Sequence, residues 1–184
     1  MIIPDYRLHE LCRAGLVLPY VLKHVNPASI DLTLSPDFVD LRTDKHFTTD
    51  ELTLRPPTIL DAIAVKLAGS QWAWMRHCAE RWLREQPRTA VLASTIEWVK
   101  IPLDCSAVLY LKSTPARCGL DHALAGWVES GFSGQLTLEL HAHRKKKLVV
   151  GQRIVQLVLC RMEDRPDVPY CGRYQGQEGP TEAR

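Results

Sequence analysis

The residues best suited to chemistry lie between positions 110 and 140, and the first of them form a cluster of donors. A predicted turn after a strand carries a lysine, two hydroxyls and an arginine, at Lys112, Ser113, Thr114 and Arg117. Such a cluster suits phosphate oxygens, because it combines positive charge with directed hydrogen bonds. The turn therefore predicts an anion-binding site.

A single carboxylate is the second feature. Glu139 lies in a predicted strand, residues 135–140, directly between Leu138 and Leu140. Burial beside apolar neighbours raises the pKa of a carboxyl group toward the range that is useful for proton transfer. The strand follows a predicted turn at residues 129–131, so the sequence predicts a hairpin that presents Glu139 near its end.

Five segments together form a pattern that can be compared with a known family. They are PASIDLTL (27–34), VLASTIEWVKIP (91–102), KSTPARCGL (112–120), AGWVESGFSGQLTLEL (125–140) and YCGRYQGQEGPT (170–181). In this order they resemble motifs of the dCTP deaminase and dUTPase superfamily. The resemblance covers most of the chain outside residues 40–90, and its specificity comes from the order of the five motifs.

The resemblance implies an enzyme that hydrolyses dCTP to dUTP and ammonia without zinc. Glu139 matches the catalytic glutamate, which acts first as general base and then as general acid. Ser113 and the backbone around Ala125 match groups that hold the water or the exocyclic nitrogen. Arg117 matches the arginine that supports the glutamate and the developing charge.

The resemblance also implies a set of substrate-binding residues and a magnesium ion that arrives with the triphosphate rather than on protein ligands. These residues are Lys112, Ser113, Thr114, Arg117, His122, Trp127, Val128, Glu129, Gln156, Tyr170, Arg173, Tyr174 and Gln177. The composition of the tail, residues 162–184, indicates disorder, whereas the resemblance implies a lid that closes over the nucleotide.

Short apolar strands separated by turn signals predict a mainly β fold, a distorted barrel or roll, in one domain spanning residues 1–184. Periodic apolar residues predict an N-terminal helix over residues 4–15 and a helical insertion over 59–86, broken near Gly69. Residues 36–58 are predicted to be loop with a short strand. The resemblance implies a barrel of the dUTPase type, assembled as a homotrimer with active sites shared between subunits.

The composition narrows the class of partner. The net charge of +2 gives no electrostatic case for a nucleic acid or a membrane, and no apolar run approaches the ~20 residues of a membrane span. Six dispersed cysteines without a C-x-x-C pair, and the absence of a signal peptide, predict reduced thiols in a cytoplasmic protein.

Other chemistries receive weaker support. Cys78-Ala79-Glu80 matches half of a zinc deaminase motif, but the P-x-x-C at residues 115–118 lacks the second thiolate. His141 and His143 share one strand face without a third ligand, which favours a surface pair. Tryptophans at 72, 74 and 82 suit stacking on bases, although a cover for the β core or a subunit contact is favoured.

Four departures from the family pattern bear on specificity. The loop before His122 is one residue shorter, and Leu124, Glu129 and Ala142 replace a threonine, an aspartate and an asparagine. Because glutamate is longer by about one methylene, its carboxylate is displaced by over ~1 Å, and the alignment of a water near the α-phosphate suffers. Gly126 favours an enzyme that also releases pyrophosphate, but we expect dUTP as the main product. The alternatives are a bifunctional deaminase that gives dUMP and pyrophosphate, and a nucleotide-binding regulatory protein.

Overall fold

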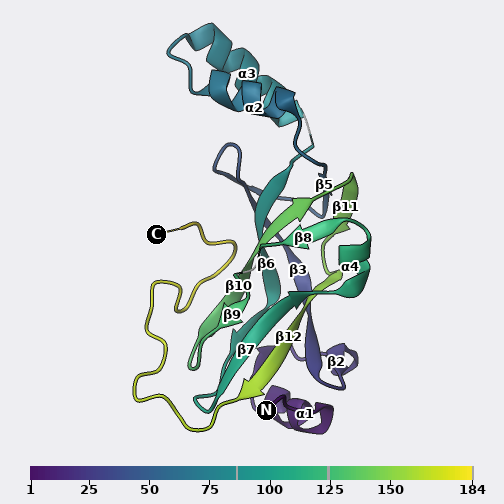
Figure 1. Cartoon of the computed structure of the whole chain (residues 1–184), viewed down its shortest axis with the longest axis vertical. Coiled ribbons are helices and arrows are strands. Elements are labelled where there is room, and N and C mark those ends of the chain that lie inside the picture. The colour runs from purple at the N-terminus through teal and green to yellow at the C-terminus, as the bar shows by residue number, and fades with distance from the viewer. Residues whose placement is uncertain (86, 124, 184) are drawn as a thin grey trace.

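A strongly curled antiparallel sheet forms the body of the computed structural model, which describes residues 1–85, 87–123 and 125–183 (Figure 1). Its main strands follow the order β8-β10-β6-β3-β12-β7-β9. They are β3 (Ser29–Asp40), β6 (Ala90–Lys100), β7 (Cys105–Leu111), β8 (Leu120–His122), β9 (Trp127–Val128), β10 (Ser133–Ala142) and β12 (Arg153–Arg161). The short strands β1 (Val17–Leu18), β2 (Val25–Asn26) and β4 (Lys45–Thr48) pair along β6 and β3. The predicted mainly β class is confirmed.

Alternating burial explains why these segments form strands around one core. In β10, Leu136, Leu138 and Leu140 are buried, whereas the intervening Thr137 and Glu139 are half-buried. This period of two places the leucines on the core side and leaves the other positions for a site. The pairing of β3 with β6 shifts register between Leu34 and Phe38, and such bulges bend a strand and increase the curl of its sheet.

The stretch 36–58, predicted to be mostly loop, is mostly strand. β3 continues to Asp40, and β4 and then β5 (Glu51–Leu54) follow it. β5 pairs with β11 (Lys146–Val149) in a small second sheet. The prediction was wrong because the polar residues of this stretch hide an alternation, in which Leu52 and Leu54 are buried.

The hairpin predicted over residues 125–140 is also wrong, although its turn is present. β9 pairs with β7, and β10 pairs with β6 and β8. The amide of Leu109 donates a 2.7 Å hydrogen bond to the carbonyl of Gly126. A Cβ at Gly126 would collide with the Leu109 carbonyl oxygen, so this pairing requires glycine and takes β9 to the opposite edge of the sheet from β8.

Two of the helices lie against the sheet. The predicted N-terminal helix is α1 (Asp5–Arg13), which buries Leu8 and Cys12. The donor cluster, predicted to be a turn, is the short helix α4 (Ser113–Arg117), which links β7 to β8. Among the described residues, no helix combines the length and the apolar character needed to cross a membrane.

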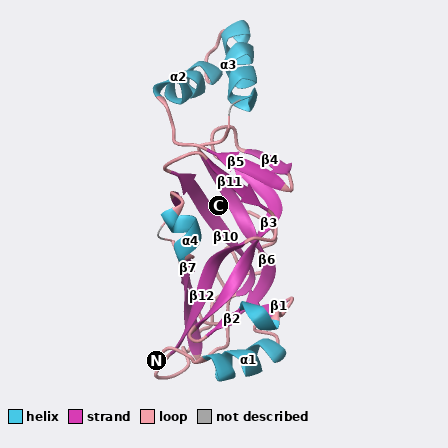
Figure 2. Cartoon of the chain, turned by 90° about the vertical axis from the view of Figure 1, so that its right-hand side faces the viewer, coloured by secondary structure: helices cyan, strands magenta, loops and turns pink. Residues whose placement is uncertain are grey.

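The other two helices project beyond the sheet, at the top of Figure 1 and of Figure 2. They are α2 (Ile59–Ala68) and α3 (Ala73–Glu85), and they confirm the predicted helical segment with its break near Gly69. Trp72 and Trp74 are 60% and 68% exposed. Trp72 directly precedes α3 and Trp74 lies on it, and α3 projects away from the sheet. The interpretation that these side chains cover the β core is therefore wrong, and the subunit contact stays a prediction.

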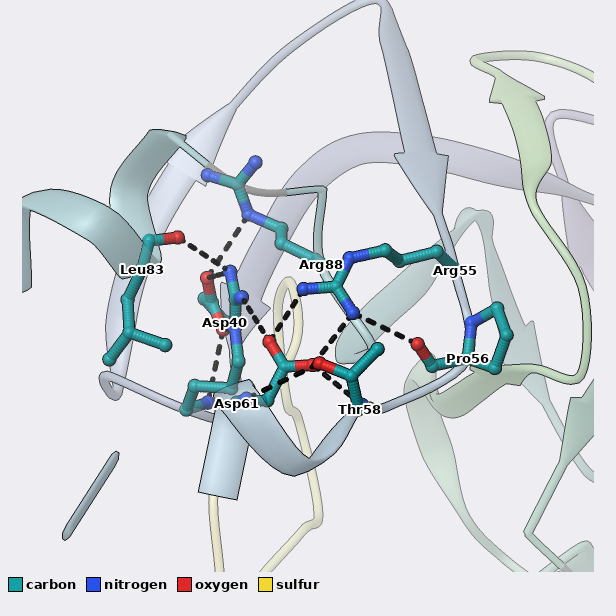
Figure 3. Close-up of polar contacts among 8 residues, drawn as sticks. Asp40, Arg55, Pro56, Thr58, Asp61, Leu83 and Arg88 are labelled. Carbon is teal, nitrogen blue, oxygen red and sulfur yellow. Dashed lines mark hydrogen bonds and ion pairs between the residues drawn. The ribbon is translucent and has the colours of Figure 1, made fainter. Parts of the chain in front are cut away.

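A buried ionic network joins this helical hairpin to the sheet (Figure 3). The Asp61 carboxylate accepts two 2.6 Å hydrogen bonds from Arg55 and also caps α2 through Thr58. Arg42 pairs with Asp40 and donates a 3.1 Å hydrogen bond to a backbone carbonyl at the end of α3. Charged groups removed from water must be paired, and this network pairs them at the base of both helices.

Candidate active site

A cavity of about 520 Å³ lies between β10, the segment 125–129 and the C-terminal tail. Eight of the predicted site residues line it. They are Ala125, Trp127, Val128, Glu129, Glu139, Tyr170, Tyr174 and Gln177. All eight residues come from two of the five motifs, the motif that contains Glu139 and the tail motif, so the other three motifs contribute none of the eight.

Glu139 is a lining residue of the cavity whose carboxyl group has a shifted pKa. Its side chain is 29% exposed, and burial raises the pKa of its carboxyl group. Its Oε2 is buried and has no hydrogen-bond partner among the described residues. Nε2 of the buried His122 lies 3.5 Å from this oxygen, and burial lowers the pKa of that imidazole. A carboxyl group whose pKa is raised in this way is suited to taking up and returning a proton.

Ala125 and Gly126 form one wall, and Ala123 and Gly126 are bonded to opposite sides of the curled sheet. The amide of Ala123 donates a 3.1 Å hydrogen bond to the carbonyl of Glu139 in β10, and Gly126 is bonded to Leu109 in β7. The backbone at Ala125 is thereby held beside Glu139. Leu124 lies outside the described residues, so its effect on specificity stays a prediction.

The tail follows the free edge of β10 as an added strand would. The amide of Gln135 donates to the carbonyl of Gln177, and the Gln177 side chain donates a 2.6 Å hydrogen bond back to the Gln135 carbonyl. Gly179 and Thr181 donate their amides to the side chains of Gln135 and Thr137. The disorder suggested by the composition is absent from this segment, and the lid function stays a prediction.

Two tyrosines bring the start of the tail over the cavity. The ring of Tyr170 lies 5.9 Å from that of Phe132, and its amide donates a 2.9 Å hydrogen bond to the carbonyl of Ser130. Tyr174 is half-buried and also lines the cavity. Arg173, between them, is exposed and does not line it.

The predicted donor cluster is not in the cavity of this chain. Ser113, Thr114 and Arg117 are exposed on α4, and neither they nor Lys112 are among the lining residues. The Lys112 ammonium donates to the carboxylate of Asp31, which is fully buried and also pairs with a neighbouring arginine. Gln156 lies in β12 opposite Asp31 and Tyr110, and it too is outside the lining. The predicted site therefore divides into a cavity group and an α4 group.

Sequence reasoning missed part of the lining. The further lining residues include Leu41, Leu92, Leu109, Phe132, Leu136, Thr137, Thr181 and Ala183. Thr137 could have been found, because it lies two residues before Glu139 and a strand presents such positions on one face. Leu41, Leu92 and Leu109 could not, because only the curl of the sheet brings them here.

The described residues contain no group of three or more His, Cys, Asp or Glu side chains placed to hold a metal ion. His143 lies 3.4 Å from the carboxylate of Asp121, and His141 is exposed on β10. Cys78 is exposed on α3. The weaker zinc and histidine alternatives therefore gain no support from the geometry.

Three comparisons with known proteins agree. A family model described as dCTP deaminase-like matches residues 2–162. A "dCTP deaminase, dUMP-forming" from Persephonella marina is 33% identical over 188 residues, which covers 100% of this chain and 97% of the relative. A relative of the same name from Sulfurihydrogenibium sp. is 33% identical over 191 residues, with the same coverage.

Among solved structures, a 2'-deoxycytidine 5'-triphosphate deaminase from Agrobacterium tumefaciens superposes with a TM-score of 0.61 at 15% identity. The match covers 86% of this chain and 47% of that chain, and it shows that the two share a fold. The family-model match spans most of the chain, and relatives above 30% identity cover all of it. The chain therefore belongs to the dCTP deaminase-like family.

Proposed function

We propose that the protein deaminates dCTP and then releases pyrophosphate, giving dUMP. The observation that carries the proposal is a half-buried glutamate, Glu139, whose pKa is raised by burial, in a cavity large enough for a nucleotide base and sugar. The relatives that cover the whole chain are named for this same pair of steps. Our sequence-based expectation of dUTP as the main product has less support than this alternative.

The first step needs one group that moves protons. Water adds to C4 of the cytosine ring while Glu139 takes its proton and passes it to N3, and ammonia leaves after a second transfer. The balance is dCTP and water to dUTP and ammonia. Backbone groups beside Ala125 lie on the wall next to Glu139 and supply fixed dipoles for the water or the leaving nitrogen.

The second step needs a water directed at the α-phosphate. Glu129 is exposed and lines the same cavity as Glu139, and Gly126 lies on the wall of that cavity. We assign Glu129 to the orientation of this water, which converts dUTP and water to dUMP and pyrophosphate. The extra methylene of glutamate relative to aspartate makes this step the more sensitive to alignment.

We further propose a homotrimer in which α4 of one copy completes the cavity of the next. Ser113 and Arg117 are exposed in the single chain, and the cavity that contains Glu139 lacks a cationic lining residue among those described. A triphosphate needs such charge, so a neighbouring copy is a source of it. Mg²⁺ would be held by the phosphate oxygens of the nucleotide.

The test is to incubate the purified protein with dCTP and Mg²⁺ and to measure ammonia, pyrophosphate, dUTP and dUMP over time. The proposal predicts ammonia and pyrophosphate in equal amounts, with dUMP as the final product. Ammonia with accumulating dUTP would restore the deaminase-only interpretation. Nucleotide binding without either product would favour a regulatory binding protein instead.

A further inference from the structure

Two buried polar atoms face each other beside the cavity, and neither has a hydrogen-bond partner among the described residues. They are Nε2 of His122 and Oε2 of Glu139, which lie 3.5 Å apart. Buried polar atoms without partners are rare in folded proteins, and two in one place need an explanation. Glu139 lines the cavity and His122 does not, so the imidazole lies on the protein side of the carboxyl group.

The backbone holds both residues in place. β8 pairs with the end of β10, with His122 opposite Leu140, and the Ala123 amide is bonded to the Glu139 carbonyl. The amide of His122 donates a 2.8 Å hydrogen bond to the Asp121 carboxylate. Only side-chain torsions remain free, and a movement of about 0.6 Å would bring the two atoms to the usual N–H···O distance of ~2.9 Å.

We propose that His122 is a positioning residue for Glu139, donating Nε2–H to Oε2 so that Oε1 is the oxygen that takes the proton from water. The role in catalysis rests on the proposed function, whereas the contact itself does not. A carboxylate with one oxygen fixed keeps the other aligned with the water, and misalignment of a catalytic group is costly in rate.

The surrounding charges agree with this assignment. Burial lowers the pKa of His122, so its imidazole is neutral near pH 7 and carries one N–H. The charge of Asp121 acts against burial and raises the pKa of His122. The charge of His141 lowers the pKa of Glu139 and so favours its ionised form. The residue of β6 opposite Glu139 is the uncharged Leu92. The other carboxyl group that lines the same cavity is that of Glu129. The donated bond stabilises the carboxylate against its own desolvation.

The first measurement needs no nucleotide. The ¹⁵N NMR spectrum of the imidazoles is recorded at pH 7 for the parent protein and for Glu139→Gln. The same variant assigns the carboxyl signal of Glu139 in the ¹³C spectrum, because that signal is missing from it. The proposal predicts that His122 is the Nε2–H tautomer and that its signal moves in Glu139→Gln. An Nδ1–H tautomer would overturn the proposal, and this result needs no substitution at His122.

The second measurement follows the pKa of Glu139 by ¹³C NMR in the parent, His122→Gln and His122→Leu. A glutamine amide nitrogen reaches close to the position of the imidazole Nε2, whereas leucine removes the donor. We expect the pKa of Glu139 to rise by roughly one unit in His122→Leu and by under about 0.3 in His122→Gln, since a lost donor disfavours the carboxylate. An unchanged pKa in His122→Leu would overturn the proposal. If His122→Leu does not fold, the tautomer of His122 in the parent protein decides whether the proposal holds.

Kinetics on dCTP separate positioning from binding. For His122→Leu we expect kcat to fall ~10-fold and its acid limb to move up by about one unit, with KM within ~3-fold, while His122→Gln keeps kcat within ~3-fold of the parent. Equal loss in both variants, or a loss confined to KM, would contradict the role. If the NMR shifts are found but no version of the protein deaminates dCTP, the contact stands and the proposed function fails.

Discussion

Glu139 shows how a strand sequence sets the ionisation of one residue. Its flanking leucines are fully buried, and the carboxyl group is itself partly removed from water. The raised pKa of Glu139 follows from this desolvation, and it was predictable from the order Leu138-Glu139-Leu140 alone. The contact with His122 was not predictable, because it depends on the pairing of β8 with β10.

The raised pKa of Glu139 has a consequence for stability. A carboxyl group whose pKa is higher in the folded state binds its proton more tightly there, so the ionised form opposes folding as pH rises through the folded pKa. We predict that Glu139→Gln has a higher midpoint of thermal unfolding than the parent at pH 7. The difference should vanish below the unfolded pKa of glutamate, about 4.3.

Calorimetry at pH 7 and at pH 4 checks this prediction. Glu163→Gln, at an exposed glutamate outside the cavity, is the matched control and should change neither midpoint. A Glu139→Gln protein less stable than the parent at pH 7 would show that the carboxylate gains more from its partners than it loses by burial.

At the scale of elements, the ionic network holds the projecting helices to the sheet. The side chain of Asp61 is 7% exposed and receives hydrogen bonds from Arg55 and Thr58, which hold the pKa of its carboxyl group well below the usual range. The stabilisation is present at neutral pH and is lost as pH falls through that lowered pKa. We predict that Asp61→Asn destabilises the hairpin α2–α3 by about 2 kcal/mol, since the buried guanidinium loses its charged partner.

Hydrogen exchange measures this effect locally. Amides of α2 and α3 should lose roughly 30-fold in protection, with little change in β6 or β10, because local opening follows local stability. Asp167→Asn, at an exposed aspartate of the tail, is the control. Unchanged protection in α2 and α3 would show that contacts between the two helices suffice without the network.

The tail gives a second prediction at this scale. Removal of residues 172–184 leaves Tyr170 packed on Phe132 but deletes the bonds to Gln135 and Thr137. We predict a folded protein, because the removed segment adds little to the core, with deamination reduced by at least ~10²-fold since the cavity loses one wall. Val168→Ala, at an exposed tail residue, should keep full activity. Full activity after truncation would remove the lid hypothesis.

The sequence predicted elements well where one apolar period dominates. The predicted helix over residues 4–15, the helical insertion predicted over 59–86 as far as it is described, and the strand predicted over 135–140 all agree with the structure. It failed at 36–58, where polar residues mask the strands, and at 125–140, where a local turn looks like a hairpin although β9 pairs with β7. Pairing partners depend on contacts far apart in the sequence, which no local pattern contains.

In the complete chain, Ser113 and Arg117 are separated from Glu139, which the sequence could not predict. Motif order placed Ser113, Arg117 and Glu139 in one site, but the fold puts Ser113 and Arg117 on α4, outside the cavity that contains Glu139. The proposed homotrimer reconciles the two, because a cyclic arrangement presents the same surface of each copy to the cavity of the next.

Mixing two inactive variants tests this arrangement. Glu139→Gln and Arg117→Ala should each form a particle of about three times the 20.8 kDa chain mass and be inactive alone. If sites are shared, subunit exchange at equal ratio should restore about a quarter of the parent activity, because one site in four combines two intact residues from different copies. No recovery after exchange, verified by light scattering and mass spectrometry, would place both residues in one chain.

Replacement of Glu139 by glutamine shows whether this carboxyl group moves the protons of cytosine deamination. Ammonia release and dCTP binding are measured for Glu139→Gln, for the control Glu163→Gln and for the parent. We predict that turnover by Glu139→Gln falls by at least ~10²-fold while dCTP binding changes by less than ~3-fold, because the amide keeps the shape but cannot accept the proton. Deamination by Glu139→Gln at close to the parent rate would show that another group moves these protons.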